Sequence, residues 1–302
     1  MLLKDLAGEY IFNCQCRKLS KRTVHNYELI LGYLLDYLSQ EHGITELEQV
    51  KPQMIKQFMM SMQKKGRKPQ YINDLLKVFK CFFRYLFDEG YTDTIITERV
   101  KNIKEPKVII KTFTDEEVKD MVNYYSGRDY LSVRNKTIMS MFFDTGIRLN
   151  ELITLTDDCI YNDYILIKHG KGDKERVVPK SPYLSKCLFK YNNIKKSYFD
   201  DKTIQFANVF LSKTGKPLTH EAIERIVRDA GKECGVDSSI RCSPHTCRHK
   251  YAQMQLKNGL DIYSLQRIMG HENISVTQRY LEGIRNSDVI KAGTKTSPLM
   301  NL

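Results

Sequence analysis

Four short segments and one tyrosine in the second half of the chain carry side chains that could react with a phosphate ester. Arginine holds phosphate oxygens through bidentate hydrogen bonds, histidine moves protons near neutral pH, and tyrosine can act as a covalent nucleophile. A His-x-x-Arg or a Gly-His occurs by chance in many proteins, so the order of the segments on one chain is the informative feature. The segments are Asp144–Leu152, Gly170–Arg176, His245–His249 and Met269–Glu272, followed by Tyr280.

In this order the segments resemble the signature of the tyrosine recombinase (phage integrase) family. The resemblance is to the compact two-domain type, like the Xer-like recombinases and mobile-element integrases. The family signature consists of an Arg after a Gly turn, a Lys on a β-hairpin, a His-x-x-Arg, a Gly-His and a nucleophilic Tyr. The match covers residues from about 112 to 283, and the corresponding residues are Arg148, Lys171, His245, Arg248, His271 and Tyr280.

The resemblance implies a site-specific DNA recombinase that needs no metal and no cofactor. Tyr280 would attack a phosphodiester, leaving a 3′-phosphotyrosyl end and a free 5′-hydroxyl. A 5′-hydroxyl of the partner duplex would then reverse the attack. The event would be the integration, excision or resolution of DNA, and the sequence determines neither which of these occurs nor the DNA target.

The other site residues would stabilise charge and move protons. Arg148 and Arg248 would clamp the two non-bridging phosphate oxygens, because preorganised cations stabilise developing negative charge. The resemblance implies that Lys171 is the general acid that protonates the leaving 5′-oxygen. Lys174 is close to it in the chain, and the Gly-Lys-Gly context favours Lys171.

Two histidines and one carboxylate would complete the site. His245 would accept the Tyr280 proton or hydrogen-bond the phosphate. His271 would hydrogen-bond the phosphate and hold the helix of the nucleophile in place. Glu151, three residues after Arg148, would lie on the same helix face, where it resembles the family acid that orients the neighbouring catalytic groups.

A zinc site is the competing interpretation of one of these segments. Cys242, His245, Cys247 and His249 fall within eight residues, and each side chain can bind zinc. Structural zinc sites pair their ligands across a longer loop, which this spacing does not provide. We therefore expect no metal, and we expect Cys247 and His249 to pack beside the site residues.

The spacing of apolar residues predicts a protein that is mainly α with a small antiparallel β-sheet. Residues 1–105 would form a helical core-binding domain, with helices that start near Lys21, Pro52 and Pro69. Gly43 would end the first of these helices, and Gly90 follows the third. Residues 106–112 would be a linker, within a stretch that is rich in charge and contains Pro106.

Residues 113–302 would form a mixed α+β catalytic domain with a C-terminal tail. Thr114 to Glu117 has the pattern of a helix capping box, and a further helix is expected over 135–143. Two short strands, 164–168 and 175–179, would form a β-hairpin around a Gly-containing loop. Helical patterning returns from Thr219.

The charge balance points to a polyanionic partner. The chain has 48 Lys and Arg against 36 Asp and Glu, a formal net charge of +12. Such an excess favours double-stranded DNA, because each neutralised phosphate releases counterions. The alternative is a solvated helix face that binds nothing. The expected DNA contacts in the first domain are Lys64, Lys65, Arg67, Lys68, Lys77, Lys80 and Arg84.

Partners and location follow from the resemblance and from what the sequence lacks. The resemblance implies a homotetramer on two DNA duplexes, with an accessory directionality factor as a further partner, and residues 284–302 could dock on a neighbouring subunit. The extra N-terminal module of some larger phage integrases is not expected. We find no apolar run of about 18 residues, no secretory signal and no disulfide framework among eight cysteines. We expect a bacterial cytoplasmic protein associated with the nucleoid.

Two alternatives remain open at this stage. One keeps the chemistry but changes its outcome, to a type IB-like enzyme that relaxes or resolves DNA. The other is a catalytically inactive, architectural DNA-binding protein. All the candidate catalytic residues are present, which favours the active recombinase.

Overall fold

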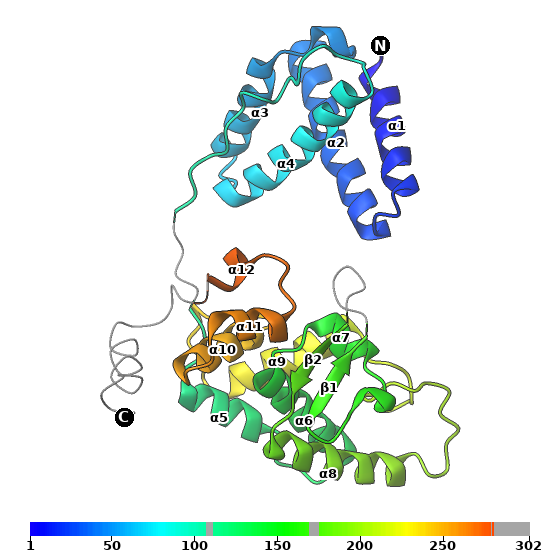
Figure 1. The fold of residues 1–302 in the computed structure, drawn as a ribbon, viewed down its shortest axis with the longest axis vertical. Helices are drawn as coiled ribbons and strands as arrows, with labels where there is room; N and C mark the ends of the chain where they lie inside the picture. The colour runs from blue at the N-terminus through cyan, green and yellow to red at the C-terminus, as the bar shows by residue number, and fades with distance from the viewer. Residues whose placement is uncertain (107–110, 169–174, 279, 281–302) are drawn as a thin grey trace. The chain divides into compact units, whose positions relative to one another are not determined.

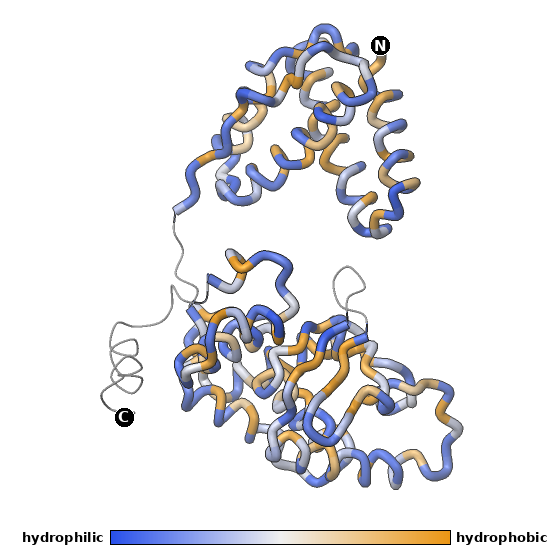
Figure 2. Tube along the Cα trace, in the orientation of Figure 1, coloured by the Kyte–Doolittle hydropathy of each residue, from blue (hydrophilic) through white to orange (hydrophobic). Residues whose placement is uncertain are grey.

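The computed structural model describes residues 1–106, 111–168, 175–278 and 280 (Figure 1). The chain divides into two compact units, Met1–Lys107 and Val108–Leu302. Each unit has its own cluster of buried apolar side chains. Figure 2 shows the apolar positions alternating with polar ones along the helices, the pattern of helices that bury one face.

The N-terminal unit is helical, as the sequence predicted. Each predicted start is confirmed, and Gly43 ends the helix from Lys21 in the left-handed conformation, with φ +66°. The sequence analysis assigned no bounds to the first helix, although its buried residues recur at helical spacing. The helices are α1 (Leu3–Cys16), α2 (Lys21–His42), α3 (Pro52–Lys64) and α4 (Pro69–Asp88), with a 3-10 turn at Leu47–Gln49.

Helix α4 lies at the centre of this unit. It buries one face, which includes Phe79, Phe82 and Phe83. Asn73, on the same helix, holds the chain that follows: its amide donates to the Ile103 carbonyl at 2.9 Å and accepts from the Ile103 amide at 2.8 Å. Asn73 also donates to Glu105 at 2.7 Å, so the chain is tied to α4 as far as residue 105.

The C-terminal unit is mixed α and β, with most of its residues in helices (Figure 1). Its helices before the hairpin are α5 (Asp115–Tyr124), α6 (Tyr130–Thr145) and α7 (Leu149–Thr154), with a 3-10 turn at Asp157–Cys159. After the hairpin come α8 (Pro182–Tyr198), α9 (His220–Glu233), α10 (Pro244–Lys257), α11 (Ile262–Met269) and α12 (Ile274–Gln278).

The predicted hairpin is present, with each strand one residue shorter than expected. Strands β1 (Tyr164–Ile167) and β2 (Arg176–Pro179) pair antiparallel, with Ile167 opposite Arg176. Alternate residues of a strand face the same side, and on β2 this places Arg176 on the side of the fully buried Val178. The loop 169–174, which contains the predicted general acid Lys171, lies outside the described residues.

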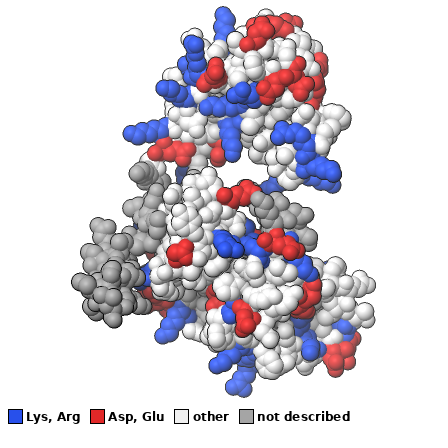
Figure 3. Space-filling model, viewed as in Figure 1, with Lys and Arg blue, Asp and Glu red and all other residues white. Residues whose placement is uncertain are grey.

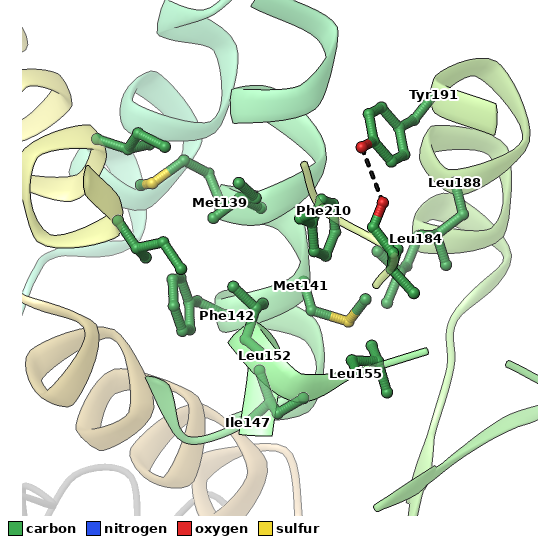
Figure 4. Close-up of a cluster of buried hydrophobic side chains, with 14 of the residues drawn as sticks. Met139, Met141, Phe142, Ile147, Leu152, Leu155, Leu184, Leu188, Tyr191 and Phe210 are labelled. Atoms are coloured by element: carbon green, nitrogen blue, oxygen red, sulfur yellow. Dashed lines mark hydrogen bonds between the residues drawn. The ribbon is translucent and has the colours of Figure 1, made fainter. Parts of the chain in front are cut away.

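Helix α6 runs through the core of the C-terminal unit. Met139, Met141 and Phe142 belong to this core, and Figure 4 shows Met141 on the side of Leu184 of α8 and Met139 on the opposite side of the helix. The predicted span of 135–143 was too short, because buried polar residues interrupt the apolar pattern. Thr145, for example, is buried at the end of the helix and donates to the Met141 carbonyl at 2.7 Å.

Glycine ends α6 at the point where the predicted site begins. Gly146 has a φ of +60°, in the left-handed region that favours glycine. A Cβ there would lie 2.3 Å from the ring of Tyr251 on α10. The absence of a side chain therefore lets α10 pack closely against the end of α6, directly before Arg148.

Candidate active site

Arg148 and Glu151 form one end of the site and hold each other at the start of α7. The Glu151 carboxylate accepts from the Arg148 backbone N–H and from its guanidinium Nη1, both at 2.8 Å. The Arg148 Nη2 donates to the carbonyl of Gly270 at 2.8 Å. The guanidinium therefore joins α7 to the turn that follows α11.

A second arginine that the sequence analysis did not assign to the site binds the same carboxylate. Arg176 of β2 makes a two-pronged ion pair with Glu151, with Nη1–Oε1 at 2.7 Å and Nη2–Oε2 at 2.6 Å. Its Nε donates to the carbonyl of Ile268 at 2.8 Å. Both side chains are buried, with 9% of Arg176 and 3% of Glu151 exposed.

The two arginines keep Glu151 ionised. Burial raises the pKa of a carboxyl group, but here the hydrogen bonds and charges of Arg176 and Arg148 outweigh burial and lower the pKa of Glu151 to about 2. One carboxylate thus lies between two guanidinium groups.

Arg248 enters the site from α10 and is nearly fully buried. Its guanidinium donates to the carbonyls of Gly146 and Met269, and it contacts His271 Nε2 at 3.2 Å. Burial, and then the charge of Arg148, lowers the pKa of Arg248 to about 10, so it remains protonated at neutral pH.

Three consecutive carbonyls at the end of α11 therefore each accept from a different arginine. Ile268 binds Arg176, Met269 binds Arg248, and Gly270 binds Arg148. The last carbonyls of a helix have no partner within the helix and carry the negative end of its dipole. This explains why arginines from β2, α10 and the start of α7 converge there.

His271 links this arginine cluster to the helix before Tyr280. Arg248 donates to its Nε2, so its Nδ1 carries the proton and donates to the Thr277 hydroxyl at 2.9 Å. Burial and the neighbouring arginines lower the pKa of His271 to about 3, in agreement with a neutral ring. Thr277 lies on α12 and is fully buried, and its carbonyl accepts from the Tyr280 backbone at 3.0 Å.

Tyr280 and two histidines meet beside the arginines. His245 and His249 lie one turn apart on α10, with their Nε2 atoms 2.8 Å apart. The Tyr280 ring is 5.0 Å from the His249 ring and 5.9 Å from that of His271, and only 3% of Tyr280 is exposed. Burial is the first cause that lowers the pKa of both His245 and His249, the latter to about 4.

The basic residues predicted to contact DNA belong to the N-terminal unit. Figure 3 shows Lys and Arg over its α3 and α4 and again where α1 ends and α2 begins, whereas its acidic side chains lie mostly toward the N-terminus. Six of the seven predicted residues are exposed, and Lys80 is half-buried. Lys77, Lys80 and Arg84 line a pocket on α4 together with Asn102 and Glu105.

The four side chains of the alternative zinc site do not gather into one group of metal ligands, although His245 and His249 lie together. Among residues 1–106, 111–168, 175–278 and 280, no group of three or more His, Cys, Asp or Glu side chains could hold a metal ion. Cys247 is instead fully buried in the apolar core, while His249 lies beside Tyr280.

Membrane-spanning helices were a second feature to check. None of the helices that the structure describes has both the length and the apolar character needed to span a membrane.

The sequence analysis missed Arg176 as a site residue, although a signal was present. Arg176 lies two residues before Val178 on a strand, and such residues share a face. An arginine on a buried strand face needs a buried partner, since an unpaired charge there is costly. Its partner, Glu151, lies 25 residues earlier, and only the fold brings the two together.

Comparison with known families identifies the class of protein. Residues 111–285 match the model of the phage integrase family, and residues 13–90 match that of the phage integrase N-terminal SAM-like domain. The chain therefore belongs to the phage integrase family. This confirms both the resemblance found in the sequence and the predicted fold class.

Individual relatives narrow the description. The chain is 28% identical over 293 residues to the tyrosine recombinase XerD of Listeria monocytogenes serotype 4b, covering 96% of this chain and 98% of the relative. It is 29% identical to XerD of Halalkalibacterium halodurans, covering 87% and 88%.

Solved structures agree on the fold. The Tn1549 transposon integrase in complex with transposon right end DNA has a TM-score of 0.76 at 20% identity, with 98% and 100% of the two chains covered. XerH recombinase bound to its palindromic difH substrate has a TM-score of 0.75 at 19% identity, with 94% and 82% covered.

Proposed function

We propose that this protein is a site-specific DNA recombinase that cuts and rejoins strands through a 3′-phosphotyrosyl intermediate on Tyr280. The observation that supports this most strongly is the arginine cluster. Arg148 and Arg248 are both held to the turn after α11, and Tyr280 packs beside the same turn. Family membership and the recombinase relatives support the same function. They do not favour the relaxing enzyme or the inactive architectural protein.

The proposed cleavage step uses the chain's own side chains. The Tyr280 oxygen attacks the phosphorus, its proton passes to His245, and a phosphorus–oxygen bond forms as the bond to the 5′-oxygen breaks. Arg148 and Arg248 neutralise the non-bridging oxygens in the transition state. Lys171 donates a proton to the departing 5′-oxygen. Attack by a 5′-hydroxyl of the partner strand reverses every step.

The arginines retain donors for the phosphate. A guanidinium has five N–H groups, and the acceptors described above for Arg148 and Arg248 do not use all of them. The protein contacts hold each guanidinium in a fixed orientation. Fixed donors need little reorganisation when charge develops, and this is the main source of electrostatic catalysis.

The N-terminal unit would bind the DNA backbone around the cleavage site. The exposed basic residues of α3 and α4 support phosphate contacts that position the protein without reading the sequence. Structural neighbours of this fold are recombinases bound to recombination sites. We further propose that the protein acts as a homotetramer on two duplexes, and that a mobile element or a chromosome supplies the sites.

The decisive experiment traps the covalent intermediate. A binding site is first selected from a library of random duplexes, and it is then nicked near the cleavage point so that the cleaved strand cannot religate. Incubation in EDTA should give a covalent protein–DNA adduct that Tyr280→Phe abolishes. Tyr263→Phe is the matched control, because that tyrosine lies exposed on the neighbouring α11. An adduct that persists in Tyr280→Phe would refute the assignment.

The outcome of the reaction needs a second assay. A plasmid with two selected sites should yield recombinant products, and their arrangement distinguishes excision from inversion. Relaxed plasmid without recombinants would instead favour the type IB-like alternative.

A further inference from the structure

Arg176 lies between two elements of the proposed site, and only 9% of its side chain is exposed. Its guanidinium touches two elements: it pairs with Glu151 of α7 and donates to the Ile268 carbonyl of α11. Its aliphatic part lies under the turn after α11, where a Cβ on Gly270 would come within 2.8 Å of Arg176 Cδ. Hydrogen bonds and packing thus fix this side chain along its whole length.

Stability alone is a weak reason for such an arrangement. Taking two charges out of water costs several kcal/mol per ion, and a buried ion pair often contributes no more than apolar residues of the same volume. The carboxylate could have been paired with Arg148 alone. A second buried arginine therefore needs an explanation in what it does to the groups around it.

Arg176 and Arg148 bind the same carboxylate, that of Glu151. Glu151 Oε1 accepts from both Arg148 Nη1 and Arg176 Nη1, and Oε2 accepts from the Arg148 backbone and from Arg176 Nη2. Without Arg176 the carboxylate would be held by Arg148 alone, through the backbone N–H and the guanidinium of that residue. Arg148 would then lose a fixed acceptor on one side, although it would keep the Gly270 carbonyl on the other.

We propose that Arg176 is a positioning residue for strand cleavage, which acts through Glu151 and the turn after α11 to hold Arg148 against the scissile phosphate. This inference rests on the proposed function of the site. Arginine is needed because three N–H groups in a rigid plane reach two carboxylate oxygens and one carbonyl together. Lysine keeps the charge but cannot fix the carboxylate in this way.

The main test compares Arg176→Lys with Arg134→Lys in single-turnover cleavage of the nicked substrate. Arg134 is also a buried arginine of this unit that donates to a carbonyl, that of Leu211, and within the described part of the chain it has no contact with the site residues. At saturating protein we expect Arg176→Lys to cleave about 10- to 100-fold more slowly, because small misplacements of a catalytic group cost rates of this order. DNA binding should be unchanged, and Arg134→Lys should cleave at the wild-type rate.

Two modified substrates separate positioning from general destabilisation. A methylphosphonate at the scissile position lacks the negative charge that Arg148 would neutralise. A 5′-bridging sulfur makes a leaving group that needs no general acid. We expect the difference between wild type and Arg176→Lys to shrink below about 3-fold on the methylphosphonate and to persist on the sulfur substrate, since Arg148 contributes by stabilising charge.

Opposite results would overturn the inference. Equal defects on all three substrates would indicate a merely structural role, and rescue by sulfur alone would place the effect on the general acid. If the wild type forms the Tyr280 adduct but Arg176→Lys cleaves normally, the positioning role fails while the proposed function stands. If the wild type forms no adduct, the proposed function itself fails.

A second pair of variants leaves Arg176 in place and compares a glycine that contacts it with a glycine that does not. Gly270→Ala would push a methyl group against Arg176 Cδ, whereas Gly235→Ala has a similar φ of +67° and nothing within 4 Å. Backbone strain is therefore matched, and the difference lies in the surroundings of Gly270, where the new methyl group would meet Arg176 and the carbonyl holds Arg148. Gly270→Ala should reproduce the Arg176→Lys pattern on the modified substrates, and Gly235→Ala should not. A Gly270→Ala enzyme with the wild-type pattern would count against the proposal.

Discussion

Replacing Glu151 by Gln should destabilise the C-terminal unit by about 3 kcal/mol at neutral pH. A carboxyl whose pKa falls from its ordinary value of 4.5 to about 2 on folding stabilises the folded state by roughly this amount. Removing one partner of a buried ion pair typically causes a similar loss of stability, about 3–5 kcal/mol, because the remaining charge is left unpaired. For a unit of this size the melting temperature should fall by about 6–12 °C.

The effect should depend on pH in one direction. The pKa of Glu151 is lower in the folded state, so its contribution is fully present above pH 4.5 and is lost as the pH falls toward 2. At pH 3 less than half of the difference in the free energy of unfolding between wild type and Glu151→Gln should remain. The difference should not grow on acidification.

Thermal unfolding followed by far-UV circular dichroism between pH 7 and pH 3 measures this difference, since the chain contains no tryptophan for fluorescence. Glu175→Gln is the matched control: this exposed carboxylate precedes Arg176 directly, and its loss should cost less than about 1 kcal/mol. An equal loss of stability in both variants, or a Glu151→Gln difference that does not change with pH, would refute the argument.

Three further predictions concern single contacts. Gly146→Ala should lower the free energy of unfolding by more than the roughly 1–2 kcal/mol that a left-handed backbone costs alanine, because the new Cβ would also lie 2.3 Å from the Tyr251 ring. Chemical denaturation measures this loss of stability. Thr277→Val removes the acceptor of the His271 proton, and it should slow adduct formation about 10-fold while DNA binding in a gel-shift assay is unchanged. Lys77→Ala should weaken binding to all DNA sequences and reduce the slope of log affinity against log salt concentration by about one. An unchanged slope would show that Lys77 does not contact the DNA backbone.

The parts of the fold that short-range signals determine could be predicted from the sequence. Pro52 and Pro69 begin helices because proline fits the first turn, and Gly43 ends one because glycine accepts a positive φ. The hairpin followed from β-branched runs around glycines. The length of helix α6 was underestimated because a buried polar residue such as Thr145 satisfies its hydrogen bond inside the helix, which the apolar pattern does not reveal.

The candidate site could be predicted only as a list of side chains. The sequence does not show that Arg148, Arg176 and Arg248 converge on the end of α11. Their carbonyl partners lie 122, 92 and 21 positions further along the chain, respectively, and only the fold brings them together. The contact between His245 and His249 could be predicted more easily, since residues four apart lie on the same face of a helix. The sequence analysis placed His249 beside the site but gave it no partner.

The anchoring of three arginines to main-chain oxygens has a consequence for how this region can vary. Every residue type supplies a carbonyl, so substitutions at Ile268 or Met269 leave these hydrogen bonds in place as long as the backbone keeps its course. An insertion or deletion of a single residue between 268 and 270 would change the spacing of the three oxygens, so that the three arginines could not all keep their partners. Position 268 should therefore tolerate changes of residue identity far better than changes of length, whereas Gly270 is restricted by its positive φ and by Arg176.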